Sequence, residues 1–395
     1  MNTNIRKVIQ FEAITPLSIG AGNDKDWIYS MDYIINDKKI YVIEMGKVIS
    51  AGVDIKEYCE LLQNNATEDL EHLLKSKIAA VSQHSDKIFD APIENYRDSV
   101  KTFIRTNGAP YIPGSSLKGA LRSAISNYLL ENISKVNYKS GRFKTLIPDK
   151  KPGNYKETDI FGEVKDGEDF MRFVQVGDIK VGATILLNTK VFNLMGGKNQ
   201  WSGGWKQSSR KTVTTFNPEG FNTIYECIRP QEKAEGSITF ATNAFEIMQG
   251  KLMVSKQHKQ DLMDKQYGLT QWFHVVNQHT LSYLQKELAF FKAYPTARTT
   301  EIETCILRLI SSINDSKDAY CVLKMAAGSG YHTITGDWNQ YSDDYVNNGK
   351  WEDQYEMKRM GIALDHKNKH RYKSRRIVEY DGKLQLMGFV KLTAL

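Results

Sequence analysis

The order of apolar and polar residues along the 395-residue chain predicts a mixture of short strands and a few long helices. Segments rich in β-branched and aromatic residues favour strands. Those segments are Lys7–Ile14, Tyr33–Ile35, Ile40–Ile43, Phe173–Val176, Thr223–Ile228, Ser237–Ala241, Tyr320–Met325, Val378–Tyr380 and Lys383–Leu392. We expect hairpins across Asn36-Asp37 and Asp381-Gly382, and a turn through Gly236.

Apolar residues recur at helical spacing in three segments, which are Leu117–Glu131, Leu269–Phe291 and Ala297–Ile313. A fourth helical pattern, Glu57–Val81, is mostly polar and is interrupted at Asn64-Asn65. A polar helix of this kind buries little surface, so we expect Glu57–Val81 to be a surface insertion.

The helix within Pro110–Ile125 begins with residues typical of an anion site. Two prolines and a glycine break the backbone, and Ser115 or Ser116 can then cap the helix. Lys118 and Arg122, four residues apart, share the face opposite the apolar stripe. Free amides, hydroxyls and cations at a helix start predict binding of an oxyanion such as phosphate. The alternative is an ordinary capped helix with solvated cations; the Walker A spacing is absent.

The segment Met195–Lys211 combines glycines, tryptophans and cations without any acid. Aromatic faces and positive charge suit single-stranded nucleic acid, because bases stack and phosphates pair. The residues expected to contact nucleic acid here are Lys198, Trp201, Trp205, Lys206, Arg210 and Lys211. The alternative is a glycine loop whose tryptophans pack back onto the protein.

Two glycine-containing turns follow predicted strands. Gly20 and Gly22 end the first strand, and Gly328-Ser329-Gly330 precedes His332 after Tyr320–Met325. Glycine lets a backbone approach a ligand closely, so both turns are candidate binding loops. The alternative for each is a plain connecting loop.

The net charge of +7 favours a polyanionic partner, and basic residues concentrate in Asn132–Lys156 and Lys358–Arg376. The four cysteines show neither zinc-ligand spacing nor a disulfide framework. His366 and His370 lie among cations, which disfavours a metal. We expect no metal, no cofactor and no membrane segment, and a cytoplasmic protein.

The stretch YIPGSSLKGALRSA, residues 111–124, resembles the signature of the RAMP superfamily, the repeat-associated subunits of type III CRISPR effector complexes. Further similarities occur in the expected order: the turn at Gly20–Gly22, Phe161-Gly162 followed by Phe173–Asp178, the glycine loop at 328–330, and the ending at 387–392. The loop at 328–330 has fewer glycines than is usual in that superfamily.

The resemblance implies an α+β fold with two ferredoxin-like (RRM-like) domains and insertions, which we place at residues 1–217 and 218–395. With its length and two halves, the chain is most similar to the fifth subunits of type III-A (Csm) complexes. That similarity implies a non-catalytic subunit that binds the CRISPR RNA (crRNA), caps its 3′ end and is needed for its maturation in antiviral defence. The implied partners are crRNA and other Csm subunits, above all the backbone RAMP subunit; target RNA and a host trimming nuclease are further candidates.

Three alternatives stay open at this point. One is a RAMP endoribonuclease that cleaves repeat RNA without a metal, with His332 as general base. Another is a backbone RAMP subunit of a type III complex, in which Asp24 or Asp26 retains a cleavage role. The third is an unrelated metabolic enzyme that holds a small phosphate at Ser115–Lys118.

Overall fold

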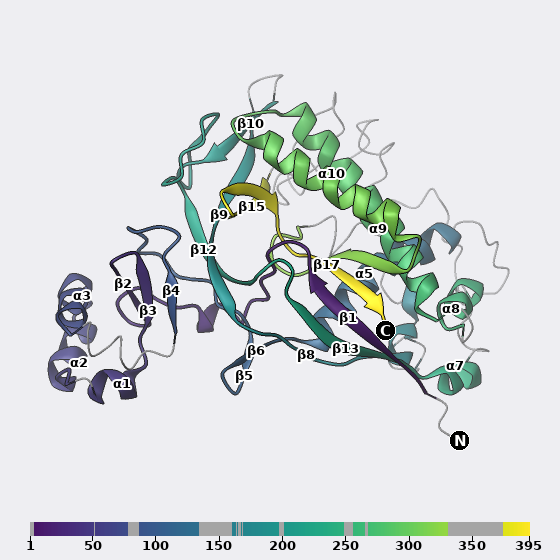
Figure 1. Cartoon of the computed structure of the whole chain (residues 1–395), viewed down its shortest axis with the longest axis horizontal. Helices are drawn as coiled ribbons and strands as arrows, with labels where there is room; N and C mark the ends of the chain where they lie inside the picture. The colour runs from purple at the N-terminus through teal and green to yellow at the C-terminus, as the bar shows by residue number, and fades with distance from the viewer. Residues whose placement is uncertain are drawn as a thin grey trace.

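The structure is a computed structural model that describes residues 4–50, 52–77, 87–133, 160–162, 164, 167, 169–196, 201–248, 256–264, 268–330 and 374–395. Two main antiparallel sheets, three long helices and a peripheral insertion make up most of the described part of the chain (Figure 1). Within these residues no helix is both long and apolar enough to cross a membrane.

The first sheet has the strand order β14-β17-β1-β13-β7, and all of its pairings are antiparallel. Its members are β1 (Ile5–Ala13), β7 (Val174–Val176), β13 (Lys233–Phe240), β14 (Tyr320–Lys324) and β17 (Phe389–Ala394). Helix α5 (Gly114–Ile133) connects β1 to β7, and α9 (Leu269–Ala293) follows β13. Taken along the chain, β1-α5-β7-β13-α9-β17 is a βαββαβ unit whose strands lie in the spatial order fourth, first, third, second. This is the expected ferredoxin-like plan, and β14 adds an edge strand to it.

Helices α5 and α9 contact each other and share one core with the first sheet. The predicted apolar stripe of α5 is confirmed, because Leu117, Leu121, Ile125 and Leu129 are all buried. Burial of each such side chain contributes about 1.5–3 kcal/mol to stability. The start of α5 is therefore held firmly against the sheet.

The second sheet has the order β11-β10-β9-β15-β16, and β12 also pairs with β9. Its members are β9 (Thr184–Gly196), β10 (Trp201–Lys206), β11 (Thr212–Val213), β12 (Asn222–Ile228), β15 (Ser374–Tyr380) and β16 (Lys383–Leu386). Helix α10 (Thr299–Ser316) lies beside α9 and packs on this sheet (Figure 1). The 25-residue helix α9 spans both cores: Trp272 belongs to the first, and Phe290 to the second.

Each sheet takes strands from both sides of the boundary that we placed at residue 217. In the first sheet β1 pairs with β13 and β17, and in the second β9 pairs with β12 and β15. The predicted units 1–217 and 218–395 are therefore not separate in the structure, because strand pairing joins distant parts of the chain.

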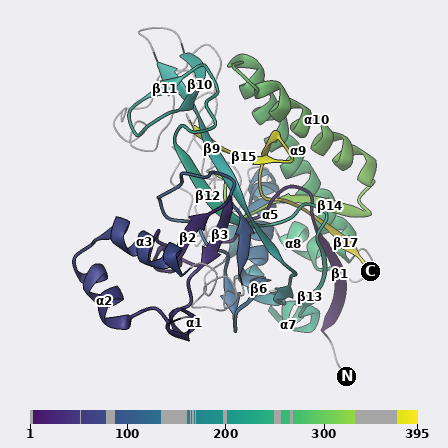
Figure 2. The same cartoon turned by 60° about the vertical axis from the view of Figure 1, so that its left-hand side comes forward.

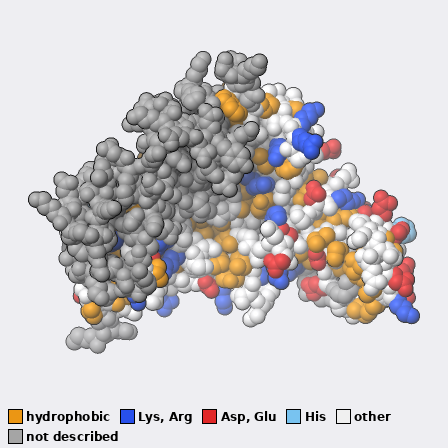
Figure 3. Space-filling view, turned by 180° about the vertical axis from the view of Figure 1, so that it is seen from behind, with side chains coloured by type: hydrophobic (Ala, Val, Ile, Leu, Met, Phe, Trp, Pro, Cys, Tyr) orange, Lys and Arg blue, Asp and Glu red, His pale blue; other side chains and the backbone are white. Residues whose placement is uncertain are grey.

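An insertion between β1 and α5 projects from one side of the molecule (Figures 1 and 2). It holds the small sheet β2 (Tyr33–Asn36), β3 (Lys39–Val42) and β4 (Ile88–Asp90), and the helices α1 (Met45–Ser50), α2 (Ile55–Gln63) and α3 (Thr67–Ser76). The predicted interruption is present, since Asn65 has φ 51° between α2 and α3. Acidic side chains gather at the outer end of this insertion (Figure 3). Exposed acids on these helices include Asp54, Glu57, Glu60, Glu68 and Asp69.

Short elements complete the described fold. These are β5 (Arg105–Thr106), β6 (Ala109–Ile112), β8 (Ile179–Lys180), the 3₁₀ turns η1 (Asn23–Lys25) and η2 (Phe170–Phe173), α7 (Thr242–Met248) and α8 (Lys256–Leu262). Helix α8 is tied to α9, because the indole of Trp272 donates a 2.7 Å hydrogen bond to the Leu262 carbonyl.

Two expectations, one about a turn and one about the length of a strand, are wrong. Gly236 lies inside β13 opposite Ile9, and a Cβ there would come within 2.7 Å of Ile179 Cδ1. This glycine permits close packing and does not make a turn. The predicted strand Lys383–Leu392 breaks at Gly388, whose φ of 83° carries the chain from the second sheet into the first.

Candidate nucleic-acid interface

A cavity of about 720 Å³ lies where three segments meet that are far apart in the sequence. They are the turn after β1, the first three turns of α5, and the loop after β14; Lys101 and Tyr225, from two further segments, complete the lining. Its lining residues are Ile19, Gly20, Gly22, Asn23, Asp26, Lys101, Ser115, Ser116, Gly119, Ala120, Arg122, Ser123, Tyr225, Ala326 and Ala327. The structure thus brings together Gly20, Gly22, Ser115, Ser116 and Arg122, which we predicted from two separate motifs.

Backbone hydrogen bonds hold the first glycine turn against the loop after β14. The Ala327 amide donates to the Ser18 carbonyl at 3.0 Å. A second bond, from the Gly388 amide to the Pro16 carbonyl at 2.8 Å, holds the same turn against the connection between β16 and β17. Gly22 and Gly328 both have positive φ, at 114° and 74°. At Gly328 a Cβ would also lie 2.6 Å from Met387 Cγ, so glycine is required there twice over.

The start of α5 differs from the prediction. The helix begins at Gly114, whose amide donates to Asp178 Oδ1 at 2.7 Å, so the cap is Asp178 and neither serine. A carboxylate at this end is favoured by the helix dipole, and it occupies the place that we assigned to a phosphate. Ser115 and Ser116 instead lie in the first turn and line the cavity.

The two predicted cations of α5 are not on a free solvated face. Arg122 forms an ion pair with Asp169 at 3.1 Å, and its guanidinium lies 3.7 Å from the centre of the Phe161 ring. Burial lowers the pKa of Lys118, although the Asp169 carboxylate opposes that change. Of the two, Arg122 lines the cavity and Lys118 does not.

The cavity also contains charged and aromatic side chains that sequence reasoning missed. Lys101 Nζ pairs with Asp26 at 2.5 Å, so a cation holds the Asp26 carboxylate in the cavity. Tyr225 presents its ring to Arg376, whose guanidinium carbon lies 5.1 Å from the ring centre. No local motif marks Lys101 or Tyr225; only the pairing of segment 100–105 with β12 places them here.

A buried ionic network fixes segment 100–105. Glu226, fully buried, accepts hydrogen bonds from the Phe103 amide at 2.8 Å, from Arg105 Nη1 at 2.7 Å and from Thr184 Oγ1 at 2.5 Å. A buried carboxylate with this many donors is satisfied, so the network orients Lys101 toward the cavity.

The tryptophan segment forms a hairpin of β9 and β10, and Trp205 belongs to the core. Its exposed fraction is 1%, its ring meets Phe192 and Phe216 edge-on, and its Nε1 donates to the Ala297 carbonyl at 2.9 Å. The prediction that Trp205 stacks on bases is therefore wrong. Trp201 is partly buried against the second core.

The remaining predicted contacts of this hairpin lie on its surface or outside the described residues. Arg210 and Lys211 are exposed, and the Lys206 amine lies 4.6 Å from the centre of the Phe221 ring. Lys198 lies outside the described residues, as do His332, His366, His370 and most of both basic runs.

The loop at 328–330 follows the cavity lining directly. Ser329 is buried and its hydroxyl donates to the Ala326 carbonyl at 2.6 Å, while Gly330 has φ 66°. Ser329 therefore shapes the loop. In the part of the chain that the structure describes, no group of three or more His, Cys, Asp or Glu side chains could hold a metal ion.

The geometry suits an extended polar ligand with anionic groups. The glycines in the lining have no side chain and the serines have short ones, so a ligand can approach the backbone. Lys101 and Arg122 supply positive charge near a tyrosine ring, the combination on which single-stranded RNA binds.

The profile of the RAMP superfamily matches residues 10–259 of this chain, which is more than half of its length. The chain therefore belongs to the RAMP superfamily.

Two relatives are named CRISPR system Cms protein Csm5. The protein from Methanocaldococcus jannaschii is 33% identical over 136 residues, covering 32% of this chain and 32% of that protein. The protein from Streptococcus thermophilus is 31% identical over 185 residues, covering 41% of this chain and 51% of that protein. The chain thus matches about a third and about half of the lengths of these relatives.

Solved structures resemble the fold over nearly the whole chain. A chain in a cryo-EM structure of a Csm–crRNA–target RNA ternary complex of a type III-A system matches 99% of this chain and all of its own, with TM-score 0.63 and 19% identity. The crystal structure of T. onnurineus Csm5 matches 96% of this chain and 99% of its own, with TM-score 0.57 and 17% identity.

Proposed function

We propose that this chain is the Csm5 subunit of a type III-A CRISPR complex, and that it binds crRNA without cleaving it. The observation that carries the proposal is the single cavity formed by the Gly20–Gly22 turn, the first turns of α5 and the loop after β14. The names of the two relatives support the assignment.

Within the complex the chain caps the 3′ end of the crRNA and sets how far trimming proceeds. Its acidic insertion and second sheet add bulk that a subunit repeated along a filament would not accommodate. Its partners are crRNA with its target RNA, the backbone RAMP subunit and a host nuclease that trims the guide. Support for a binding role comes from Lys101 and Arg122, which line the cavity together with the hydroxyl side chains of Ser115 and Ser116.

Gly119 offers a direct test of RNA binding in the cavity. It lines the cavity, and a Cβ built on it meets nothing within 4 Å. Gly119→Glu therefore adds bulk and negative charge without a clash, and it replaces a poor helix former by a good one. We expect affinity for single-stranded RNA to fall at least about tenfold, while Gly119→Ala stays close to the parent protein.

The readouts are fluorescence anisotropy of labelled RNA and thermal unfolding. Unchanged RNA affinity in a folded Gly119→Glu protein would place RNA elsewhere. Incubation of the purified protein with repeat RNA tests the non-catalytic role: intact RNA is expected, and cleavage that His332→Ala abolishes would favour an endoribonuclease.

The position in the complex is tested in cells. Without this chain, complexes of the other subunits are expected to carry guides with altered, mostly untrimmed 3′ ends, measured by sequencing of the bound RNA. Native mass spectrometry is expected to find one copy per complex, and several copies would assign the chain to the filament body.

A further inference from the structure

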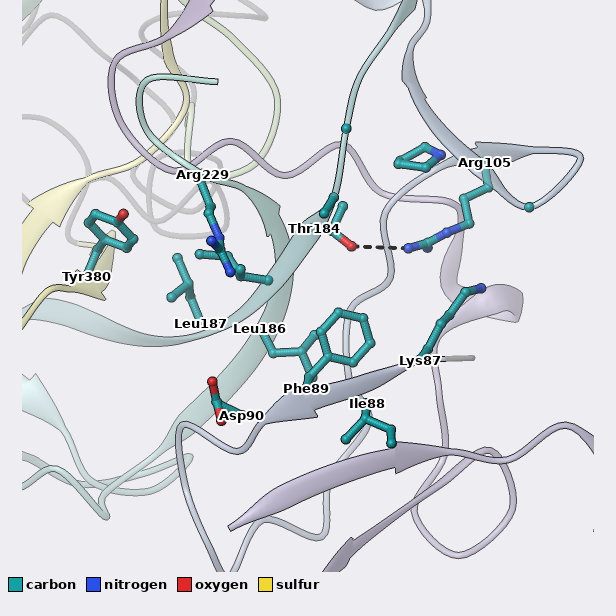
Figure 4. Close-up of a pocket in the computed structure, with 15 residues that line it drawn as sticks. Lys87, Ile88, Phe89, Asp90, Arg105, Thr184, Leu186, Leu187, Arg229 and Tyr380 are labelled. Carbon is teal, nitrogen blue, oxygen red and sulfur yellow. Dashed lines mark hydrogen bonds between the residues drawn. The ribbon is translucent and has the colours of Figure 1, made fainter. Parts of the chain in front are cut away.

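A second cavity, of about 660 Å³, runs along one edge of β9 and shares no lining residue with the first (Figure 4). Its lining includes residues 182–187, at and before the start of β9, and Lys87–Asp90, which contain β4. Successive side chains of a strand point to opposite faces of the sheet. When every residue of a strand segment lines one cavity, the cavity therefore lies at the edge of the strand, where its main-chain N–H and C=O groups point. The cavity therefore borders two strand edges.

The pairing of β9 with β12 shows in which direction the N–H and C=O groups of β9 point. Glu226 and Ile228 lie opposite Leu186 and Thr184, yet their amides donate away from β9, to the carbonyls of Lys101 and Leu17. Leu186 and Thr184 are therefore in non-hydrogen-bonded pairs with β12, and their own N–H and C=O groups point to the opposite edge. Among the described residues, no backbone partner meets those groups.

Strand β15 occupies the same edge farther along β9 and then leaves it. Its pairing runs from Ser374 opposite Asn193 to Val378 opposite Thr189. The chain then turns beyond Tyr380, which lines the cavity, and continues as β16. The cavity thus lies beside β9 where β15 would have continued. Strand β4 borders the cavity too and pairs with β3 alone among the described strands.

The charged side chains that line this cavity beside β9 are mainly positive. Lys87, Arg105 and Arg229 line the cavity. Arg105 is paired with the buried Glu226, whereas Arg229 is exposed and points into the cavity (Figure 4). Asp90 is the one carboxylate among the lining residues that the structure describes, and it is paired with Lys39. The apolar part of the lining is supplied by Ile88, Phe89, Leu186, Leu187 and Tyr380.

We propose that this cavity binds an extended acidic segment of a partner protein, which adds a strand to the open edge of β9. Outward N–H and C=O groups two residues apart match the repeat of a second polypeptide strand, which pairs with both kinds of group. Acidic side chains of the added strand face Arg229, and aliphatic ones pack on Phe89 and Leu186. The inference rests on the sheet geometry and is independent of the RNA-binding proposal.

The test uses the full chain and a labelled ten-residue peptide of alternating glutamate and valine. Saturable binding by fluorescence anisotropy is expected, with slower hydrogen exchange of the Thr184 and Leu186 amides in the bound state. A matched pair of peptides, N-methylated on one edge or the other, is expected to bind unequally, because only one edge pairs with β9. Arg229→Glu is expected to weaken binding about tenfold, and Lys56→Glu, on the exposed surface of α2, is the matched control.

Several results would overturn the proposal. They are no saturable binding at millimolar peptide, equal affinity for both N-methylated peptides, or unchanged exchange at Thr184 and Leu186. Protection of these two amides by single-stranded RNA, in competition with the peptide, would also overturn it and assign the cavity to nucleic acid.

Discussion

The amide of Gly114 donates a 2.7 Å hydrogen bond to Oδ1 of Asp178, 64 residues farther along the chain. The bond caps α5 and fastens its start to the segment between β7 and β8. No larger residue fits at Gly114, because a Cβ there would lie 2.1 Å from the Val176 carbonyl oxygen. The start of the helix is thus fixed from the sheet side.

Removal of this cap is expected to destabilise the protein without closing the cavity at the start of α5. Asp178→Ala should lower the free energy of unfolding by about 1 kcal/mol, within the usual range of about 0.5–2 for a lost cap. Asp178→Asn keeps an acceptor and should lose less. Urea unfolding of the two variants measures the difference, and equal stability of all three proteins would contradict the assigned cap.

Trp205 is expected to affect stability and not base stacking. Trp205→Ala should cost about 3–5 kcal/mol, because it empties a core site and leaves the Ala297 carbonyl without its donor. Trp201→Ala, at a partly buried position, should cost less. Thermal unfolding gives the ranking, and anisotropy below the melting temperature gives RNA affinity. A stable Trp205→Ala protein with weakened RNA binding would restore the stacking interpretation.

Lys101 and Arg122 are expected to supply two of the phosphate contacts. Single-stranded nucleic acid contributes about 0.7 to the log–log salt slope for each phosphate contact. The double variant Lys101→Gln/Arg122→Gln should therefore bind RNA with a slope that is smaller by roughly 1.4. The measurement is RNA affinity across a salt series, with Lys56→Gln as control. An unchanged slope would mean that these cations serve only their carboxylate partners.

Lys324 is expected to make stability depend on pH. Its amine is buried and donates to the Met387 carbonyl, and burial lowers its pKa to about 7 against the pull of Glu287. An unfolded lysine titrates near pH 10.4, so between about pH 7 and 10 the unfolded state holds one proton more. The free energy of unfolding should therefore rise with pH in this window, by about 1.4 kcal/mol per pH unit from this group.

Lys324→Met removes that proton and keeps most of the side-chain volume. Urea unfolding at several pH values between 7.5 and 9.5 should give a shallower rise for the variant than for the parent protein. Lys190 is also buried, and its pKa is lowered to about 8. Its contribution to the pH dependence of stability is the same in the variant and in the parent protein. Parallel stability curves would show that Lys324 titrates at its ordinary pH.

Most elements could be predicted because their signals are local. The apolar stripe of α5, the length of α9 and the hairpin of β2 and β3 follow from spacing and turn residues within each segment. Glycine was ambiguous, since it marks either a turn or a close contact. At Gly203 and Gly236, both inside strands, an added Cβ would lie 2.4 Å from the Tyr294 carbonyl oxygen and 2.7 Å from Ile179. Such neighbours cannot be seen in one sequence.

The candidate site was predictable as separate motifs but not as one cavity. Its charges are held by partners distant in sequence: Lys101 pairs with Asp26, and Arg122 with Asp169, across 75 and 47 residues. In the sequence nothing marks these acids as the partners of the two cations, so the cations look solvated, whereas the fold pairs each of them with a carboxylate. The domain boundary placed at residue 217 does not separate two units, for the same reason. Strands from both sides of it pair within one sheet, and such long-range pairing cannot be read from the local sequence.

The position of β17 has a consequence for the order in which the protein folds. This strand lies between β1 and β14, and the Phe389 amide donates to the hydroxyl of Thr15, 374 residues earlier. During synthesis one edge of β1 stays unpaired until β17 leaves the ribosome. A contact this distant in sequence closes slowly, and an open strand edge invites pairing with other chains. Until β17 joins the sheet, the newly made chain therefore exposes a strand edge to which another chain can pair.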